Sequence, residues 1–454
     1  MKFQFGWFAV GLVGLGCTAS PASFDRVQSK VAERTGHRVE WNRDRAEAGR
    51  LEQEVSSLLR RPLTAERAVQ IALLNNRDLQ ARFEELGIAQ ANLVEAGLLT
   101  NPSFGLSVRF PDRSPSGKNV EYSIAQNLIE LILRPARTRI AAGQVAEAET
   151  SAANEVLKVV AEVKTAFYTA QARKQLLDQL HALAQTNETA TEFTRRLHDA
   201  GNVSELDLAN QQSAAAQSQI EVSQSELELR RDRERLNQLL GLSGDEIDWV
   251  MADHLPEIPG SEVSFRQLES RALAQRLDLQ LAKTKLDSLG RTLALRAHTR
   301  YLPAEISLGI DTERDPGGVR VTGPTLDLEL PIFNQGQGEI ARLTAQYREA
   351  QRELESLAIN IRSEVRTARD QLAAARKMTS YIGSELLPIR RKALQLTLEQ
   401  YNYMLKGAYD LLLAKQNEIA AERSYLEARR DYWIARAELE RAVGGGLGGR
   451  PGSN

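Results

Sequence analysis

Short stretches in which apolar and polar residues strictly alternate predict β-strands with one apolar face and one polar face. The first stretch runs from Ser103 to Phe110, with serine, glycine and arginine between its apolar residues. These apolar residues are Phe104, Leu106, Val108 and Phe110. A polar turn follows at 111–118, and the alternation resumes at Val120, Tyr122 and Ile124. A period of two on either side of a turn predicts a pair of adjacent strands.

The same alternation returns about 200 residues later. Its apolar residues are Ile306, Leu308 and Ile310, followed after a glycine turn by Val319 and Val321. Gly323-Pro324 predicts a kink that shifts the register before Leu326, Leu328 and Leu330. An apolar face opposite a polar face is typical of an outer-membrane barrel with a wet lumen. A soluble sandwich that buries one face is the alternative interpretation.

Four strands cannot close into a barrel, and an isolated four-stranded sheet would leave two exposed edges. Three copies of the chain would supply twelve strands and remove every edge. The strand count therefore favours a trimer, although it leaves two or four copies open.

Long segments with apolar residues three and four positions apart predict helices. In one of them these residues are Val156, Val159, Val160, Val163 and Phe167. No proline interrupts 136–200, so this helix would run roughly 90–100 Å, with a return helix at about 204–240. A second long arm is predicted at about 337–405, interrupted by Pro388. Helices of this length need neighbours along their whole length, as a helical barrel or a soluble coiled-coil scaffold would provide.

The chain is an internal duplication. Segments 63–91 and 263–292 each open a helix and share Asp-Leu-Gln, and proline ends each of them. Later, Ala200-Gly201 and the residues after it correspond to Lys406-Gly407 and its followers. We therefore predict a lead segment at 18–62, a first repeat at 63–262 and a second at 263–443. The glycine-rich tail at 444–454 is expected to be disordered.

The N-terminus predicts a secretion signal. Lys2 precedes an apolar run at 3–15, which is too short to span a bilayer as a helix. Gly16-Cys17 then resembles the end of a lipoprotein signal at 1–17, with Cys17 acylated and Thr18 favouring the outer membrane. Cleavage of an ordinary signal at Ala19 or Ala22 is the alternative.

Charge and composition point away from nucleic acid and from catalysis. The net charge is -2, with 58 basic and 60 acidic residues, so we expect no nucleic-acid partner. The five histidines form no ligand pair, and the single cysteine is assigned to lipidation. We expect no catalytic residue, no resident metal and no cofactor.

The doubled pattern resembles the TolC family of outer-membrane efflux proteins over roughly 60–443. The resemblance rests on the order of the elements, on the Gly201 turn motif and on Leu328–Gly336 after the last strand. It implies a mixed α and β fold: a trimeric twelve-stranded transmembrane barrel continued by a long helical barrel across the periplasm. The implied partners are a periplasmic adaptor, an inner-membrane pump and outer-membrane lipid. Residues 129–135 depart from the pattern, so the join from strand to helix is expected to differ there.

The resemblance also implies roles for particular residues. The hairpin tips that dock the adaptor would be Gly201, Asn202, Val203, Ser204, Lys406, Gly407, Ala408 and Tyr409. The lipid-facing strand would be that of Phe104, Leu106, Val108 and Phe110. Asp207 and Asp410 are the candidate carboxylates of the periplasmic aperture, although the alignment places Leu413 opposite Asp207 and leaves Asp410 out of step.

The implied function is a passive export duct and not an enzyme. Segment 24–60 is similar to the lead of ducts paired with heavy-metal pumps, which favours metal cations as cargo. Drugs or other organic solutes are the alternative cargo. A soluble periplasmic coiled-coil adaptor and an envelope enzyme are the alternatives of a different class.

Overall fold

The computed structural model describes residues 21–110, 112–113, 117–262, 265–303 and 305–447. Cys17 and the predicted signal lie outside these residues. The helices are α1 Pro21–Thr35, α2 Arg45–Leu59, α3 Ala65–Asn75, α4 Arg77–Gly97, α5 Ile129–Asp199, α6 Glu205–Leu240, α7 Leu268–Gln275, α8 Leu277–Thr299, α9 Gln337–Tyr381, α10 Leu387–Asn402 and α11 Ala408–Val443. The strands are β1 Ser103–Arg109, β2 Asn119–Asn127, β3 Ile306–Arg314 and β4 Arg320–Leu328. Short η1 (Gly244–Ile247) and η2 (Ile382–Leu386) complete the order.

Two compact units share the chain, and each draws on both sequence repeats. Of the described residues, the sheet unit holds 21–25 together with Glu84–Ala148 and Asp287–Ala345. The helical unit holds Arg26–Phe83, Glu149–Leu286 and 346–447. The units therefore cut across the duplication, because each repeat sends its strands to one unit and its hairpin to the other.

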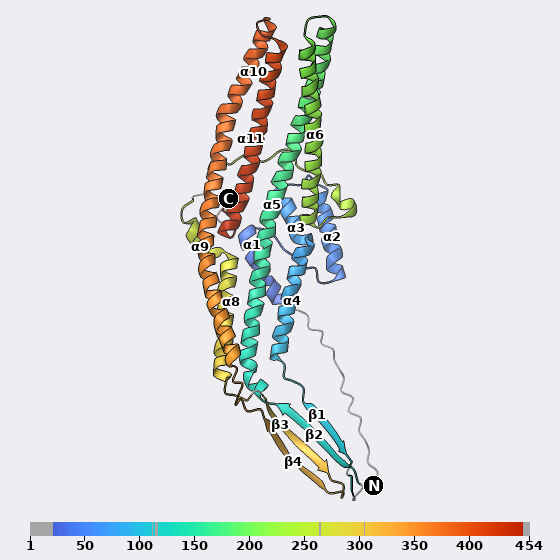
Figure 1. The fold of residues 1–454 in the computed structure, drawn as a ribbon, viewed down its shortest axis with the longest axis vertical. Helices are drawn as coiled ribbons and strands as arrows, with labels where there is room; N and C mark the ends of the chain where they lie inside the picture. The colour runs from blue at the N-terminus through green and yellow to red at the C-terminus, as the bar shows by residue number, and fades with distance from the viewer. Residues whose placement is uncertain (1–20, 111, 114–116, 263–264, 304, 448–454) are drawn as a thin grey trace. The chain divides into compact units, whose positions relative to one another are not determined.

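The sheet has four antiparallel strands in the order β1-β2-β3-β4 (Figure 1). The alternation correctly predicted all four strands, and Phe110 lies just beyond the end of β1. The predicted kink at Gly323-Pro324 is wrong, since the β3–β4 register runs unbroken from Ile306↔Leu328 to Arg314↔Arg320. β4 is an edge strand of this sheet, where proline is tolerated because its missing N–H need not join the ladder.

Two long antiparallel hairpins, α5 with α6 and α10 with α11, extend from the helical unit (Figure 1). The 71 residues of α5 correspond to roughly 105 Å at 1.5 Å each. Thr191 of α5 donates a hydrogen bond to the carbonyl of Gln211 on α6 at 3.3 Å, which ties the two helices together. The return helices α6 and α11 both have 36 residues, and each is followed by a left-handed glycine, Gly241 or Gly444.

The connections from strand to long helix differ between the repeats, as expected. β2 ends at Asn127 and α5 begins at Ile129, whereas residues 329–336 separate β4 from α9. The Asn127 side chain accepts from the Ile129 N–H at 3.0 Å and so starts α5 without a linker.

The second outgoing arm contains a π-helical turn at Ile382–Leu386, which ends two residues before Pro388. The predicted interruption at Pro388 is therefore a widened turn within a continuing helix. Gly383 lies in this turn beneath the Tyr425 ring of α11, and a Cβ atom there would come within 2.8 Å of the ring. The glycine allows α11 to pack closely at this level.

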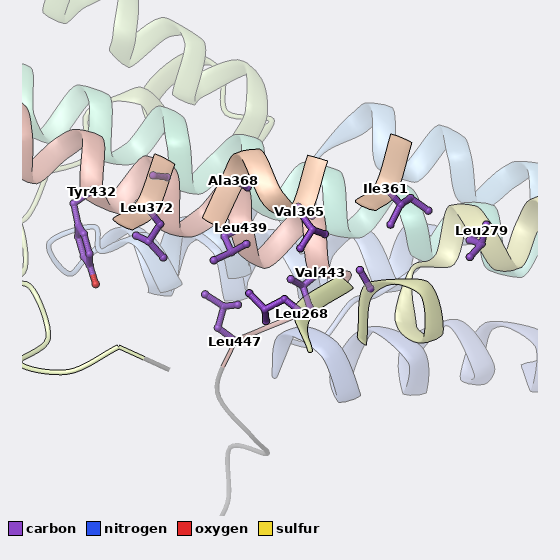
Figure 2. Close-up of a cluster of buried hydrophobic side chains, with 13 residues drawn as sticks. Leu268, Leu279, Ile361, Val365, Ala368, Leu372, Tyr432, Leu439, Val443 and Leu447 are labelled. Atoms are coloured by element: carbon purple, nitrogen blue, oxygen red, sulfur yellow. The ribbon is translucent and has the colours of Figure 1, made fainter. Parts of the chain in front are cut away.

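A hydrophobic core in the helical unit joins α7, α9 and α11 (Figure 2). Its most buried side chains include Ile361, Val365, Leu372, Tyr432 and Leu439. Leu447 belongs to the same cluster and is 2% exposed. The core therefore extends beyond the last helix.

The first part of the predicted disordered tail is ordered, so that prediction is wrong for Gly444–Leu447. Gly446 donates its N–H to the Arg34 carbonyl at 3.0 Å. Arg271 donates to the Gly446 carbonyl at 2.7 Å. The two bonds hold the N–H and the carbonyl of Gly446, which has no side chain to pack. Residues 448–454 lie outside the described part of the chain.

The lead segment is folded onto the helical unit. The Arg26 side chain donates to Glu149 at 2.9 Å, and His37 is hydrogen-bonded to Glu66 at 2.8 Å. Val39 and Trp41 of the lead segment are buried. Within the described residues, no helix combines the length and the apolar character needed to cross a bilayer.

Candidate functional site

The apolar face of the sheet is exposed, which reverses the usual burial of a sheet. Phe104, Ile124 and Ile310 pair across three strands and are 66%, 58% and 62% exposed. Leu106, Leu308, Leu326 and Leu328 share this face and are exposed as well. An exposed apolar surface of this continuity marks a contact with lipid or with protein.

The opposite face of the sheet is polar and acidic. The continuous register places Glu121, Asp311, Glu313 and Asp327 on it, with Arg109 as its basic residue. Arg109 pairs with Glu121 at 2.7 Å, and Asn119 donates to Glu313 at 2.5 Å. Gly105 also lies on this face, and a Cβ atom there would clash with the hydroxyl of Ser123 on the neighbouring strand. After the Arg109–Glu121 pair, three carboxylates have no basic partner on this face of the strands.

The first hairpin reverses direction at a left-handed glycine. Gly201 has φ 76°, its N–H reaches the His198 carbonyl at 2.8 Å, and the Asn202 N–H reaches Leu197 at 2.8 Å. These two bonds satisfy the last carbonyls of α5. Ser204 then caps α6 in a reciprocal pair: its hydroxyl accepts from the Asp207 N–H at 3.2 Å, and the Asp207 carboxylate accepts from the Ser204 N–H at 3.3 Å.

The second hairpin has the same geometry around a different residue. Met404 has φ 60°, its N–H reaches Tyr401 at 2.9 Å, and the Leu405 N–H reaches Gln400 at 2.9 Å. Gly407 has an ordinary φ of -84° and is the residue before α11. Its N–H donates to Asp410 at 3.1 Å, as that of Ser204 does to Asp207 at 3.3 Å.

The geometry corrects the predicted correspondence of the two tips. Gly201 matches Met404, and Ser204 matches Gly407, so Asp207 and Asp410 occupy equivalent positions. The interpretation of Asp410 as out of step is wrong, because Gly407 was taken for the turn glycine when it is the helix cap. Both carboxylates cap the first turn of their helices, and this stabilising role is by itself enough to explain why an aspartate is found at each position.

The two hairpins of the helical unit approach each other near the tips. Thr194 of α5 and Tyr409 of α11 line the same groove. Partial burial, reinforced by the Asp207 carboxylate, raises the pKa of Tyr409. The groove has a volume of about 710 Å³ and lies between the hairpins, with Phe193, Tyr401 and Leu412 among its lining residues. Of the predicted tip residues, Ala408 and Tyr409 line this groove, and Gly201–Ser204 do not.

An ion-pair network holds the base of α11. Arg276 pairs with Asp278 at 2.6 Å and also contacts Glu364, which in turn pairs with Arg441 at 2.5 Å. Burial raises the pKa of the Glu364 carboxyl, but its bonds to Arg276 and Arg441 outweigh burial and hold the pKa below its usual value. The repeated Asp-Leu-Gln motif thus has a structural role at Asp278. In the part of the chain that the structure describes, no group of three metal-ligating side chains was found.

Sequence reasoning missed two features of these surfaces. Met404 carries none of the signals of a turn residue, and only its positive φ identifies it. The acidic face was overlooked because its carboxylates come from three different strands. The alternation of each strand, taken together with the antiparallel order, would have placed them on one face.

An outward-facing apolar sheet together with a doubled helical hairpin defines a mixed α and β protein of the membrane-channel type. The model of the outer membrane efflux protein family matches residues 68–242 and 268–445, and the chain belongs to this family. Its members are passive channels of the bacterial outer membrane that extend into the periplasm. The family therefore confirms the predicted location and the prediction that the chain is not an enzyme, and it excludes a soluble adaptor.

The relatives of this chain are named for different exported substances. The cobalt-zinc-cadmium resistance protein CzcC of Cupriavidus metallidurans is 23% identical over 390 residues, which cover 84% of this chain and 90% of the relative. The toluene efflux pump outer membrane protein TtgC of Pseudomonas putida is 25% identical over 410 residues, covering 83% and 82%. The crystal structure of CusC is similar with a TM-score of 0.68 at 16% identity, covering 84% of this chain and 92% of CusC. The structural match shows the fold alone.

Proposed function

We propose that three copies of the chain form the outer-membrane exit duct of a tripartite efflux system for divalent metal cations. The duct is supported by the sheet, which exposes its apolar side chains on one face and carries polar and acidic side chains on the other. Twelve strands from three copies would remove the two open edges of each sheet. Lipid would then cover Phe104, Leu106, Val108 and their cross-strand neighbours.

The metal cargo is supported by the charge of the polar face. Three carboxylates per chain without a basic partner on that face would give the lumen a negative potential, which attracts cations and repels anions. The similarity to the cobalt-zinc-cadmium resistance protein, and the lead segment at 24–60, agree with this cargo. Hydrated cations need no resident site in order to pass through such a duct.

Organic solutes are the second candidate cargo. The relatives named for toluene and antibiotic efflux match about as much of the chain as the metal-resistance relative does. A wet channel admits any solute that the pump delivers, so the pump rather than the duct would set the selectivity. The acidic face is the feature that favours cations over this alternative.

The hairpin ends are proposed as the docking surface for a periplasmic adaptor, which connects the duct to an inner-membrane pump. The surface comprises Gly201, Asn202, Val203, Ser204, Lys406, Gly407, Ala408 and Tyr409. Asp207 and Asp410, now equivalent, are proposed to line the periplasmic aperture while they cap α6 and α11. Acylation of Cys17 remains a proposal, and mass spectrometry of the purified chain tests it.

Deletion of the gene, followed by growth across divalent metals and organic toxicants, tests the cargo. Sensitivity to metals alone is expected. Complementation with the triple variant that combines Asp311→Asn, Glu313→Gln and Asp327→Asn should restore metal resistance less well than the wild type does at equal expression. Sensitivity to organic compounds alone would contradict the metal cargo and leave the duct in place. No change on either panel would contradict the efflux function itself.

A further inference from the structure

Met404 adopts a backbone conformation that its side chain opposes. The chain reversal at each hairpin tip requires a residue in the left-handed region, where a Cβ atom crowds the neighbouring carbonyl. The first hairpin meets this requirement with Gly201 at φ 76°, and the second uses Met404 at φ 60° with the same pair of hydrogen bonds. Glycine would make the second turn without that steric cost.

The fold gains little from the methionine side chain. Met404 is 93% exposed, and its neighbours Tyr403 and Leu405 are 78% and 73% exposed. Turns of this type usually place an apolar contact between the second residue after the cap and a residue of the last helical turn. Here those positions are Leu405 and Gln400, so no apolar pair forms. Strain that the chain itself does not use points to a role outside the chain.

We propose that Tyr403, Met404 and Leu405 form an apolar plug that inserts into a concave apolar socket on the periplasmic adaptor. In this arrangement Met404 is the residue that selects the partner. This inference rests on the proposed docking function of the hairpin ends, and it makes the two ends unequal. The first tip offers Gly201-Asn202-Val203-Ser204 and contributes mainly backbone and polar groups.

The shape and charge of the tip favour an adaptor over the other possible occupants. A convex end of three residues is not self-complementary, so two copies cannot bury each other's tips. Lys406 and Asp410 lie in the same turn at 3.6 Å, and a membrane surface would have to accept both charges together with the plug. An adaptor socket buries the three apolar side chains and leaves that ion pair at its rim. The unbranched thioether of methionine adapts to such a socket at small cost.

Replacing Met404 with glycine separates the proposed role from folding. Met404→Gly removes the side chain and relieves the positive φ, while glycine adds freedom to the unfolded chain, so the two effects on stability oppose each other. The thermal midpoint of the purified full-length protein should stay within a few degrees of the wild type. Loss of one well-buried side chain should weaken adaptor binding roughly tenfold or more.

The binding probe is the purified adaptor whose deletion reproduces the sensitivity pattern of this gene, measured by biolayer interferometry on immobilised full-length protein. Met404→Leu keeps an apolar side chain and should retain binding within about threefold. Ile389→Ala, at an exposed position on α10 away from the turn, is the matched control and should bind as the wild type does.

Unchanged adaptor binding by Met404→Gly would overturn the plug while the docking function stands. Loss of binding to phosphatidylglycerol-containing vesicles, or of self-association, with adaptor binding intact would also overturn it in favour of lipid or a second copy. Failure of the wild type to bind any adaptor would instead refute the proposed docking function.

Discussion

A lysine at the centre of the apolar face distinguishes a sheet in lipid from a sheet in water. Ile124 lies in the middle of β2, pairs with Phe104 on one side and Ile310 on the other, and is exposed. Ser123 is the next residue and points to the polar face, where it pairs with Gly105 and Asp311. Ile124→Lys and Ser123→Lys therefore add the same charge one residue apart on opposite faces.

The two variants should differ greatly in the free energy of the membrane-inserted trimer, because each of its three copies carries the substitution. A lysine on the lipid side of a barrel strand costs about 2–4 kcal/mol near the middle of the bilayer. A trimer would therefore lose roughly 6–12 kcal/mol. On a sheet exposed to water, the same change at an already exposed position would cost no more than about 0.5 kcal/mol. Ser123→Lys gains a nearby carboxylate in Asp311 and should be nearly neutral in either setting.

The assay measures the amount of trimer that resists dissociation in SDS, together with recovery of the protein in the outer-membrane fraction. Ile124→Lys should reduce both strongly, and Ser123→Lys should leave both near the wild-type level. Equal recovery of the two variants would refute the assignment of this face to lipid. A loss for Ser123→Lys alone would mean that the two faces have been assigned the wrong way round.

Two further predictions concern the helical unit. Gly241→Ala should destabilise the fold by about 1–3 kcal/mol, because Gly241 has φ 68° and a Cβ atom would lie 2.3 Å from the Asn75 carbonyl. Gly49→Ala, at an open helical position in α2, should instead stabilise the fold by about 0.5–1 kcal/mol. Calorimetry in detergent compares the two variants. The folded pKa of Glu364 is held below the ordinary value of 4.5, so its stabilising contribution is complete above that pH and is lost as the pH falls through the folded pKa. Glu364→Gln should therefore flatten the fall of the unfolding midpoint below pH 4.5, and parallel curves for the variant and the wild type would contradict the role of this carboxylate.

The repeating patterns of the chain were sufficient to predict the strands, the long arms and the duplication. Alternation fixes which residues share a face, and Phe104, Leu106 and Val108 lie where it placed them. Single-residue geometry was not accessible in the same way. A glycine was taken as the turn of the second tip, since glycine is the usual left-handed residue, but Met404 holds that position while Gly407 caps the next helix.

Tertiary contacts account for the other differences. The glycines of the tail suggested a chain without a core of its own, but the backbone of Gly446 is held by Arg34 and Arg271, which are distant in sequence. The register at Pro324 was misjudged because the tolerance of an edge strand for proline depends on its place in the sheet. Both features depend on contacts between segments that are distant in the chain, and the pattern within a single segment does not predict such contacts.

The π-helical turn at Ile382–Leu386 has a mechanical consequence. A π-helical turn interrupts the regular i→i−4 hydrogen bonds of an α-helix and is a usual place for a helix to bend, and Pro388 removes a further donor just beyond it. The stretch of α5 from Ala136 to Asp199 contains no proline and is an unbroken α-helix. The outgoing arm of the first hairpin is therefore uniformly stiff along that stretch, whereas bending compliance in the second is concentrated at one level, opposite Tyr425. A force applied at the second tip is resisted mainly at that turn, so its bending stiffness determines how far the tip moves.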